Sequence, residues 1–297
     1  MRSSFIVIMI LFFGGCSMKV PNTWKSKIED NKIDNIKLYS RVEGVGDPIV
    51  MLHGFGTSSF SFRFIIPSLS EKYKVFALDL KGFGDSPKPR DGAYSVYDQA
   101  LLVSKFIKDN NLKDIILVGH SFGGGVALSL ALLEPNNIKA MILLDSASYK
   151  QKLPTMIRWL NIPILGKAGF YLLPSELETR EAYNYAFFDD KKIPKESIKE
   201  LSKKLKLKNA RYAFCQTAQT MIPDDIDDIS KLYSNITIPT LILWGNDDIV
   251  IKKSIGKKLH QNLSNSTLKI IHNCGHMPHE EKPKETVRLI LSFLKNL

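Results

Sequence analysis

The sequence predicts an α/β protein: a mostly parallel sheet of about eight strands, with helices on both faces and an inserted helical cap. Short apolar runs alternate with amphipathic runs along most of the chain. Strands buried on both faces form continuous apolar runs, and their alternation with helices is typical of parallel sheets, so this order predicts the core. One long segment without a strand-like run predicts the cap.

The core is expected in two parts, residues 36–148 and 235–297. Its predicted strands are Ile49–Leu52, Lys74–Leu80, Ile115–Val118, Ala140–Leu144, Thr240–Trp244 and Thr267–Ile271. Its predicted helices are Ser58–Ser70, Val96–Asn110, Phe122–Leu133, Lys252–Asn262 and Lys284–Leu294.

The segment between the two parts, residues 149–234, is the predicted cap. Its pattern is helical, and its first half is rich in large apolar residues. The segment is divided by Pro154, Pro163, Pro174, Pro194 and Pro223. We expect some of its apolar side chains to pack on the core and others to line a substrate pocket.

The first sixteen residues have the pattern of a targeting segment. Arg2 precedes an unbroken apolar run, Phe5–Phe13, which is shorter than the ~20 residues that span a bilayer and is typical of a secretory signal. The Gly-Gly-Cys that follows resembles the lipobox of bacterial lipoproteins. That resemblance implies acylation of Cys16, export, membrane anchoring in a bacterial cell envelope, and a tether over residues 17–35. The alternatives are an uncleaved weak anchor or a soluble secreted or periplasmic protein.

Composition excludes several classes of protein. Of 297 residues, 44% are apolar and 24% charged, which is typical of a globular chain. The net charge is +11, but the lysines are spread out and no basic–aromatic platform is visible, so we expect no nucleic-acid partner. Three cysteines without a CxxC pair exclude a disulfide scaffold. In an oxidising compartment Cys215 and Cys274 could pair.

A candidate nucleophile lies in the run Gly119-His120-Ser121-Phe122-Gly123. This G-x-S-x-G pattern follows a predicted strand and opens a predicted helix, which is the context that lifts the serine hydroxyl clear of the sheet. An ordinary helix N-cap is the alternative interpretation of Ser121.

A serine nucleophile needs a base in hydrogen-bonding reach, and the base needs an orienting acid. His276 follows the last predicted strand, at the sheet edge where active sites form, and is the predicted base. His272 and His279 are the alternatives. The acid should lie between the serine and the histidine in chain order.

Three carboxylates follow predicted strands in that interval: Asp145, Asp247 and Asp248. The residues alone leave the choice among them open. A glycine-rich turn, His53-Gly54-Phe55-Gly56, follows the first clear strand. In this geometry the backbone N–H groups of Phe55 and Phe122 would form an oxyanion hole, whereas a plain tight turn is the alternative.

Together, five sequence motifs resemble those of the capped α/β-hydrolase family. They are HGFG (53–56), DLKGFGDS (79–86), GHSFGG (119–124), WGNDD (244–248) and GHMPHEEKP (275–283), in the family's order. The resemblance implies a triad of Ser121, Asp248 and His276. Lys81 stands where Arg is usual, and Lys252 where Pro commonly follows the acid.

The resemblance also implies a reaction. Ser121 occupies the place where epoxide hydrolases and dehalogenases of the family have an aspartate, and GHSFGG is similar to the motif of simple esterases and lipases. We therefore expect hydrolysis of a carboxylic ester through an acyl-enzyme, with a small-molecule ester substrate and neither cofactor nor metal. The alternatives are a carbon–carbon bond hydrolase with the same triad, or a non-catalytic binding module on this fold.

Overall fold

The computed structural model describes residue 33 and residues 35–160 and 165–297. The predicted signal segment with Cys16, and nearly all of the predicted tether, lie outside the described residues. Within the described part of the chain, no helix is both long and apolar enough to cross a membrane.

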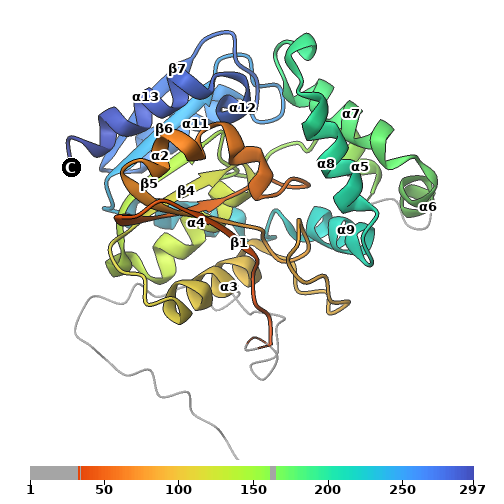
Figure 1. Ribbon diagram of the computed structural model, residues 1–297, viewed down its shortest axis with the longest axis horizontal. Helices are drawn as coiled ribbons and strands as arrows, with labels where there is room; N and C mark the ends of the chain where they lie inside the picture. The colour runs from red at the N-terminus through yellow and green to blue at the C-terminus, as the bar shows by residue number, and fades with distance from the viewer. Residues whose placement is uncertain (1–32, 34, 161–164) are drawn as a thin grey trace, which may run out of the picture.

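A single sheet forms the centre of the molecule (Figure 1). Its strands are β1 (Ser40–Glu43), β2 (Asp47–Leu52), β3 (Tyr73–Leu78), β4 (Ile115–His120), β5 (Ile138–Leu144), β6 (Thr240–Gly245) and β7 (Ser266–Ile271). They lie in the order β1-β3-β2-β4-β5-β6-β7, and β1 alone is antiparallel to its neighbour. The mostly parallel α/β prediction is therefore confirmed, with seven strands among the described residues where about eight were expected.

Helices cover both faces of the sheet (Figure 1). On one face lie α3 (Val96–Asp109), α4 (Phe122–Leu133) and α11 (Lys253–Asn262), and on the other lie α2 (Ile66–Ser70) and α13 (Pro283–Leu294). Alternate residues of β2 contribute to the two hydrophobic cores: Val50 and Leu52 to one, Ile49 and Met51 to the other. This alternation explains why the central strands are apolar throughout.

Two predicted elements have different bounds in the structure. The expected helix over 58–70 is a 3₁₀ helix, η1 (Ser59–Phe64), followed by the short α2. Pro67 lacks the N–H that a continuous helix would need at that position. The strand expected to reach Leu80 ends at Leu78, because the N–H of Leu80 donates instead to His53 Nε2 at 3.0 Å.

A helical segment connects β5 to β6 and lies to one side of the sheet (Figure 1). Its elements are α5 (Thr155–Trp159), α6 (Leu165–Leu172), α7 (Ser175–Ala186), η3 (Asp190–Lys192), α8 (Lys195–Leu205), α9 (Ala210–Thr220), α10 (Ile226–Lys231) and η4 (Leu232–Asn235). Pro154, Pro174 and Pro194 each precede the first residue of a helix, where a fixed φ and a missing N–H cost nothing.

The two cysteines in the described part of the chain, Cys215 and Cys274, are buried thiols. Cys215 packs in a small hydrophobic cluster of the helical segment, whereas Cys274 belongs to one face of the core. The possible Cys215–Cys274 disulfide is therefore not formed.

Candidate active site

Ser121 lies on a sharp turn between β4 and α4. Its backbone has φ 51° and ψ −117°, a strained conformation for a residue with a side chain. A Cβ atom on Gly119 would lie 2.6 Å from the Gly123 carbonyl oxygen, and one on Gly123 would collide with the Leu52 carbonyl. The close approach of these backbones therefore requires both glycines of the motif. Although Ser121 occupies the N-cap position of α4, its side chain makes no capping hydrogen bond.

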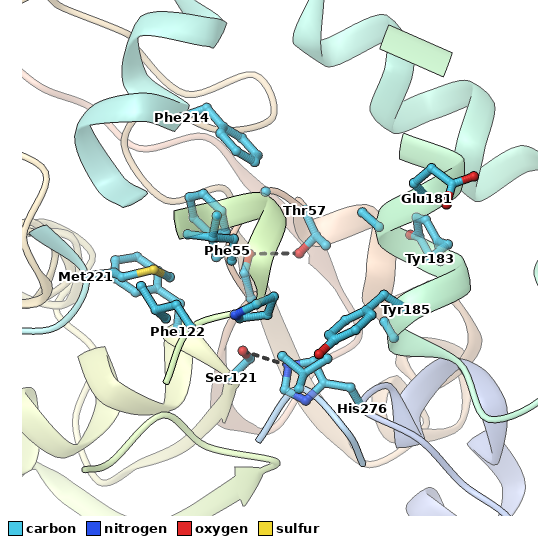
Figure 2. A pocket seen from close by; sticks show the side chains of 18 of the residues that line it. Phe55, Thr57, Ser121, Phe122, Glu181, Tyr183, Tyr185, Phe214, Met221 and His276 are labelled. Atoms are coloured by element: carbon cyan, nitrogen blue, oxygen red, sulfur yellow. Dashed lines mark hydrogen bonds between the residues drawn. The ribbon is translucent and has the colours of Figure 1, made fainter. Parts of the chain in front are cut away.

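The Ser121 hydroxyl donates instead to His276. The distance from Ser121 Oγ to His276 Nε2 is 2.8 Å (Figure 2). On the other side of the ring, His276 Nδ1 lies 2.8 Å from Asp248 Oδ2. All three side chains are buried. The chain of hydrogen bonds assigns the Nδ1–H tautomer to His276, with Nε2 free to accept the serine proton.

Backbone contacts fix the loop that carries His276. Its N–H donates to the carbonyl of Ala186, at the end of α7, at 2.7 Å. Its carbonyl accepts from His120 Nε2 at 2.8 Å. The base is thus held both by the helical segment and by the residue that precedes the serine.

Among the three candidate acids, Asp248 is the one that contacts His276. Its second oxygen, Oδ1, accepts the N–H groups of Val250 at 2.7 Å and Ile251 at 2.9 Å, which hold the carboxylate in place. Asp247 interacts with the Asn246 amide instead. Asp145 lies close to Asp248, but its side-chain hydrogen bond is with the N–H of Gly245 and not with His276.

The alternative histidines have other environments. His272 is exposed, and the structure does not bring it to Ser121. His279 is buried between the rings of Phe62 and His120. Burial, and then the neighbouring His276, lower the pKa of His279 to about 3, so it is neutral at physiological pH.

The turn at residues 53–56 brings the backbone N–H of Phe55 near the serine, and the N–H of Phe122 follows the serine directly in the chain. A Cβ atom on Gly54 would lie 2.7 Å from His120 Nδ1 and 3.2 Å from the Ser121 Cβ, so only glycine allows this approach. Within the described part of the chain, neither the N–H of Phe55 nor that of Phe122 donates to a protein acceptor. Both are therefore available to an oxyanion on a bound substrate.

Ser121 and His276 form part of the wall of a cavity of about 620 Å³ (Figure 2). Most of its described lining is apolar and comes from both the sheet edge and the helical segment. Phe214 packs against Phe55 with a ring-centroid distance of 4.3 Å and stacks on Phe170 at 4.9 Å. Among the described lining residues there is no Lys or Arg, and the two charged side chains are Glu178 and Glu181.

Sequence analysis missed several residues of this cavity. Thr57, whose hydroxyl donates to the Gly54 carbonyl at 2.9 Å, follows the HGFG motif closely and could have been found by position. Tyr183 and Tyr185 line the cavity from α7 and carry no sequence signal beyond their helical context.

Three buried groups lie close enough to be considered as metal ligands. One atom from each of Asp145, Asp248 and His276 lies within 4.8 Å of the others. However, both ring nitrogens of His276 already serve the hydrogen bonds to Ser121 and Asp248. The arrangement therefore matches a proton-transfer triad better than a set of ligands directed at one ion.

A family model described as the alpha/beta hydrolase fold matches residues 47–171 and 177–283. The chain belongs to the α/β-hydrolase family. One relative is the uncharacterized hydrolase YugF of Bacillus subtilis, which is 32% identical over 277 residues, covering 91% of this chain and 98% of that protein.

Two further relatives of this α/β-hydrolase carry more specific names. Lipase 3 of Moraxella sp. is 27% identical and the match covers 85% of this chain and 78% of the lipase. The 2-hydroxy-6-oxo-2,4-heptadienoate hydrolase of Pseudomonas putida is also 27% identical, covering 84% of this chain and 90% of that enzyme. These names span more than one reaction, so the family alone does not select the bond that is cleaved.

Proposed function

We propose that the protein is a serine hydrolase that cleaves carboxylic esters through an acyl-enzyme. The observation that carries the proposal is the hydrogen-bonded chain Ser121–His276–Asp248, with the serine on a strained turn at an apolar cavity.

The geometry supports a two-step reaction. Ser121 Oγ attacks the ester carbonyl while its proton passes to His276 Nε2, and Asp248 stabilises the imidazolium. The N–H groups of Phe55 and Phe122 stabilise the oxyanion, each by about 3 kcal/mol. His276 then protonates the leaving alcohol, and a water molecule that gives its proton to His276 releases the acid and restores Ser121.

The cavity lining favours an uncharged substrate. A heptadienoate-type substrate of a carbon–carbon hydrolase carries a carboxylate. Among the described lining residues, no Lys or Arg is present to bind such a group, and Glu181 would repel it. The other acidic lining residue, Glu178, is paired with Arg211 at 2.8 Å. An ester with an apolar acyl group meets no such penalty. The similarity to a lipase supports the same choice.

The test is the hydrolysis of p-nitrophenyl esters whose acyl chains run from acetyl to palmitoyl. Wild-type protein is compared with Ser121→Ala and with a matched control, Ser129→Ala, which removes another buried hydroxyl from α4. We expect hydrolysis by the wild type and the control, and none above background by Ser121→Ala. Turnover of a dienone acid in preference to every ester would support the carbon–carbon alternative, and binding without turnover the non-catalytic one.

We also propose that the protein is exported and anchored to a membrane of the cell envelope through Cys16. The proposal rests on the Gly-Gly-Cys sequence after the apolar run. Metabolic labelling with a fatty acid should mark the wild type and not Cys16→Ser, while Cys215→Ser should label normally. Equal labelling of the Cys16→Ser protein would contradict it.

A further inference from the structure

Asp145 is a buried carboxyl group that the proposed triad does not use. It follows β5 directly and is fully buried. Its backbone φ is 42°, in the left-handed region that residues with a side chain rarely adopt. Its N–H donates to the Leu243 carbonyl of the adjacent β6 at 3.0 Å. The chain therefore holds this carboxyl at the junction of two central strands in spite of backbone strain.

The hydrogen bonds of Asp145 are incomplete. Its Oδ1 accepts the N–H of Gly245 at 2.9 Å. Within the described part of the chain, no N–H or hydroxyl donor reaches Oδ2, although that atom is buried. What the carboxyl does face is the carboxyl of Asp248: one oxygen of each lies within 4.8 Å of the other.

Ionising both of two carboxyl groups this close together in a buried site is strongly unfavourable, because their repulsion adds to the loss of solvation. Asp248 receives three N–H groups, from Val250, Ile251 and His276, whereas Asp145 receives one. Since N–H donors stabilise the ionised form, the negative charge belongs on Asp248 and the proton on Asp145.

We propose that Asp145 is a protonated positioning residue whose carboxylic acid donates a hydrogen bond to the Asp248 carboxylate. This inference rests on the proposed function, since it assigns a second support to the acid of the triad. The pKa of Asp145 is raised well above its usual range, first by burial and then by the charge of Asp248. The pair then carries one negative charge, which is what stabilises the His276 imidazolium.

Other ionisable groups face this site from the neighbouring elements. Glu281, on α12 (Pro278–Glu281), adds to the raised pKa of Asp145. The buried thiol of Cys274 lies near both aspartates, and the pKa of that thiol is raised mainly by burial. Asp248 and Glu281 both oppose the ionisation of Asp145, so its surroundings favour the neutral acid.

The first experiment measures the unfolding equilibrium of the full-length protein against pH. Below the unfolded pKa of about 4, Asp145 is protonated in both states and contributes nothing. Above it, the unfolded chain loses the proton and the folded protein keeps it, so folding is disfavoured by up to tenfold per pH unit. Asp145→Asn removes this dependence.

We therefore expect the ratio of the unfolding constants, wild type over Asp145→Asn, to rise as pH increases above about 4. Asp247→Asn is the matched control. Asp247 lies at the same sheet edge, but its carboxylate accepts a hydrogen bond from the Asn246 amide and is not proposed to share a proton with Asp248. A constant ratio for Asp145→Asn would overturn the proposal. If that variant does not fold, ¹³C-carboxyl NMR of the aspartates in wild-type protein decides: the absence of any aspartate that stays protonated at neutral pH would also overturn it.

The second experiment compares ester hydrolysis by Asp145→Asn and Asp145→Leu. The asparagine amide can still donate to Asp248, whereas leucine cannot. We expect kcat to fall on the order of tenfold for leucine with little change in KM, and to be restored by asparagine. Equal losses in both variants would contradict a donor role. If no variant and no wild-type protein hydrolyses any ester, the proposed function fails, while the pH dependence of unfolding still tests the shared proton.

Discussion

Glu280 should hold the helical segment against the core, because its buried carboxylate accepts hydrogen bonds from residues of both. Its Oε2 accepts from Arg63 at 3.0 Å and from Ser197 of α8 at 2.9 Å, and its Oε1 accepts from Tyr183 of α7 at 3.2 Å. The Glu280 side chain is fully buried and that of Arg63 is 10% exposed. The perturbation is Glu280→Ala, which removes the carboxylate and leaves the guanidinium in place.

The expected cost follows from the partners that remain. Removing one member of a buried ion pair typically lowers the free energy of unfolding by roughly 3–5 kcal/mol, because the other charge is left buried without a partner. Here Glu196 lies 3.8 Å from the Arg63 guanidinium and is largely exposed, so it compensates in part. We therefore expect a loss of about 3 kcal/mol in the free energy of unfolding, equivalent to roughly 6 °C in Tm for a chain of this size.

The assay is urea unfolding at neutral pH, with thermal unfolding as a second measurement. The control is the double variant Arg63→Met/Glu280→Leu, which leaves no unpaired charge and should be more stable than Glu280→Ala. A loss below about 1 kcal/mol for Glu280→Ala would refute the reasoning. So would a double variant that is less stable than the single one.

Three further predictions concern the site and its support. Asp248→Asn should lower kcat by about 10³- to 10⁴-fold, since the amide no longer favours the His276 tautomer that accepts the serine proton, and an unchanged kcat would contradict this role. Because the folded pKa of His279 is about 3 and the unfolded value about 6.5, the unfolded chain binds more protons between these limits; stability should fall as pH decreases through this window, and His279→Asn should reduce the slope by up to about 1.4 kcal/mol per pH unit in acid unfolding curves. Gly123→Ala should cost about 3 kcal/mol in urea unfolding, because the new methyl group would meet the Leu52 carbonyl, and a neutral result would show that the turn can relax.

Much of the core could be predicted because its signals are local. The six apolar runs correspond to β2 to β7. The central strands β4 and β6 are buried along their whole length, so their sequences are almost entirely apolar, whereas β7 at the sheet edge is half-buried and still keeps an apolar run. The edge strand β1 was missed: its sequence is Ser-Arg-Val-Glu, and it exists because its backbone pairs with β3. A strand stabilised by a neighbour that is distant in sequence leaves little pattern of its own.

Some residues of the candidate site could likewise be predicted from local sequence, and others could not. The glycine spacing around Ser121 and the position of His276 after a strand are properties of short segments, and they are enough to nominate both residues. The choice among Asp145, Asp247 and Asp248 is different, because all three follow strands that end at one edge of the sheet. Asp247 and Asp248 are neighbours in one loop, and the backbone conformation of that loop decides which of their side chains points toward His276.

By itself, the sequence determined the α/β class, the strained serine turn and the order of the triad candidates, since propensity, periodicity and motif spacing act over a few residues. Only the tertiary structure decided that Asp145 meets Asp248. The strands β5 and β6 are neighbours in the sheet, although Met141 of β5 pairs with Thr240 of β6, which is 99 positions later in the chain. It also decided the cavity and the contact of Arg63 with Glu280, which are 217 residues apart. Such features arise from packing between distant segments, and their energy depends on burial, which no local pattern specifies.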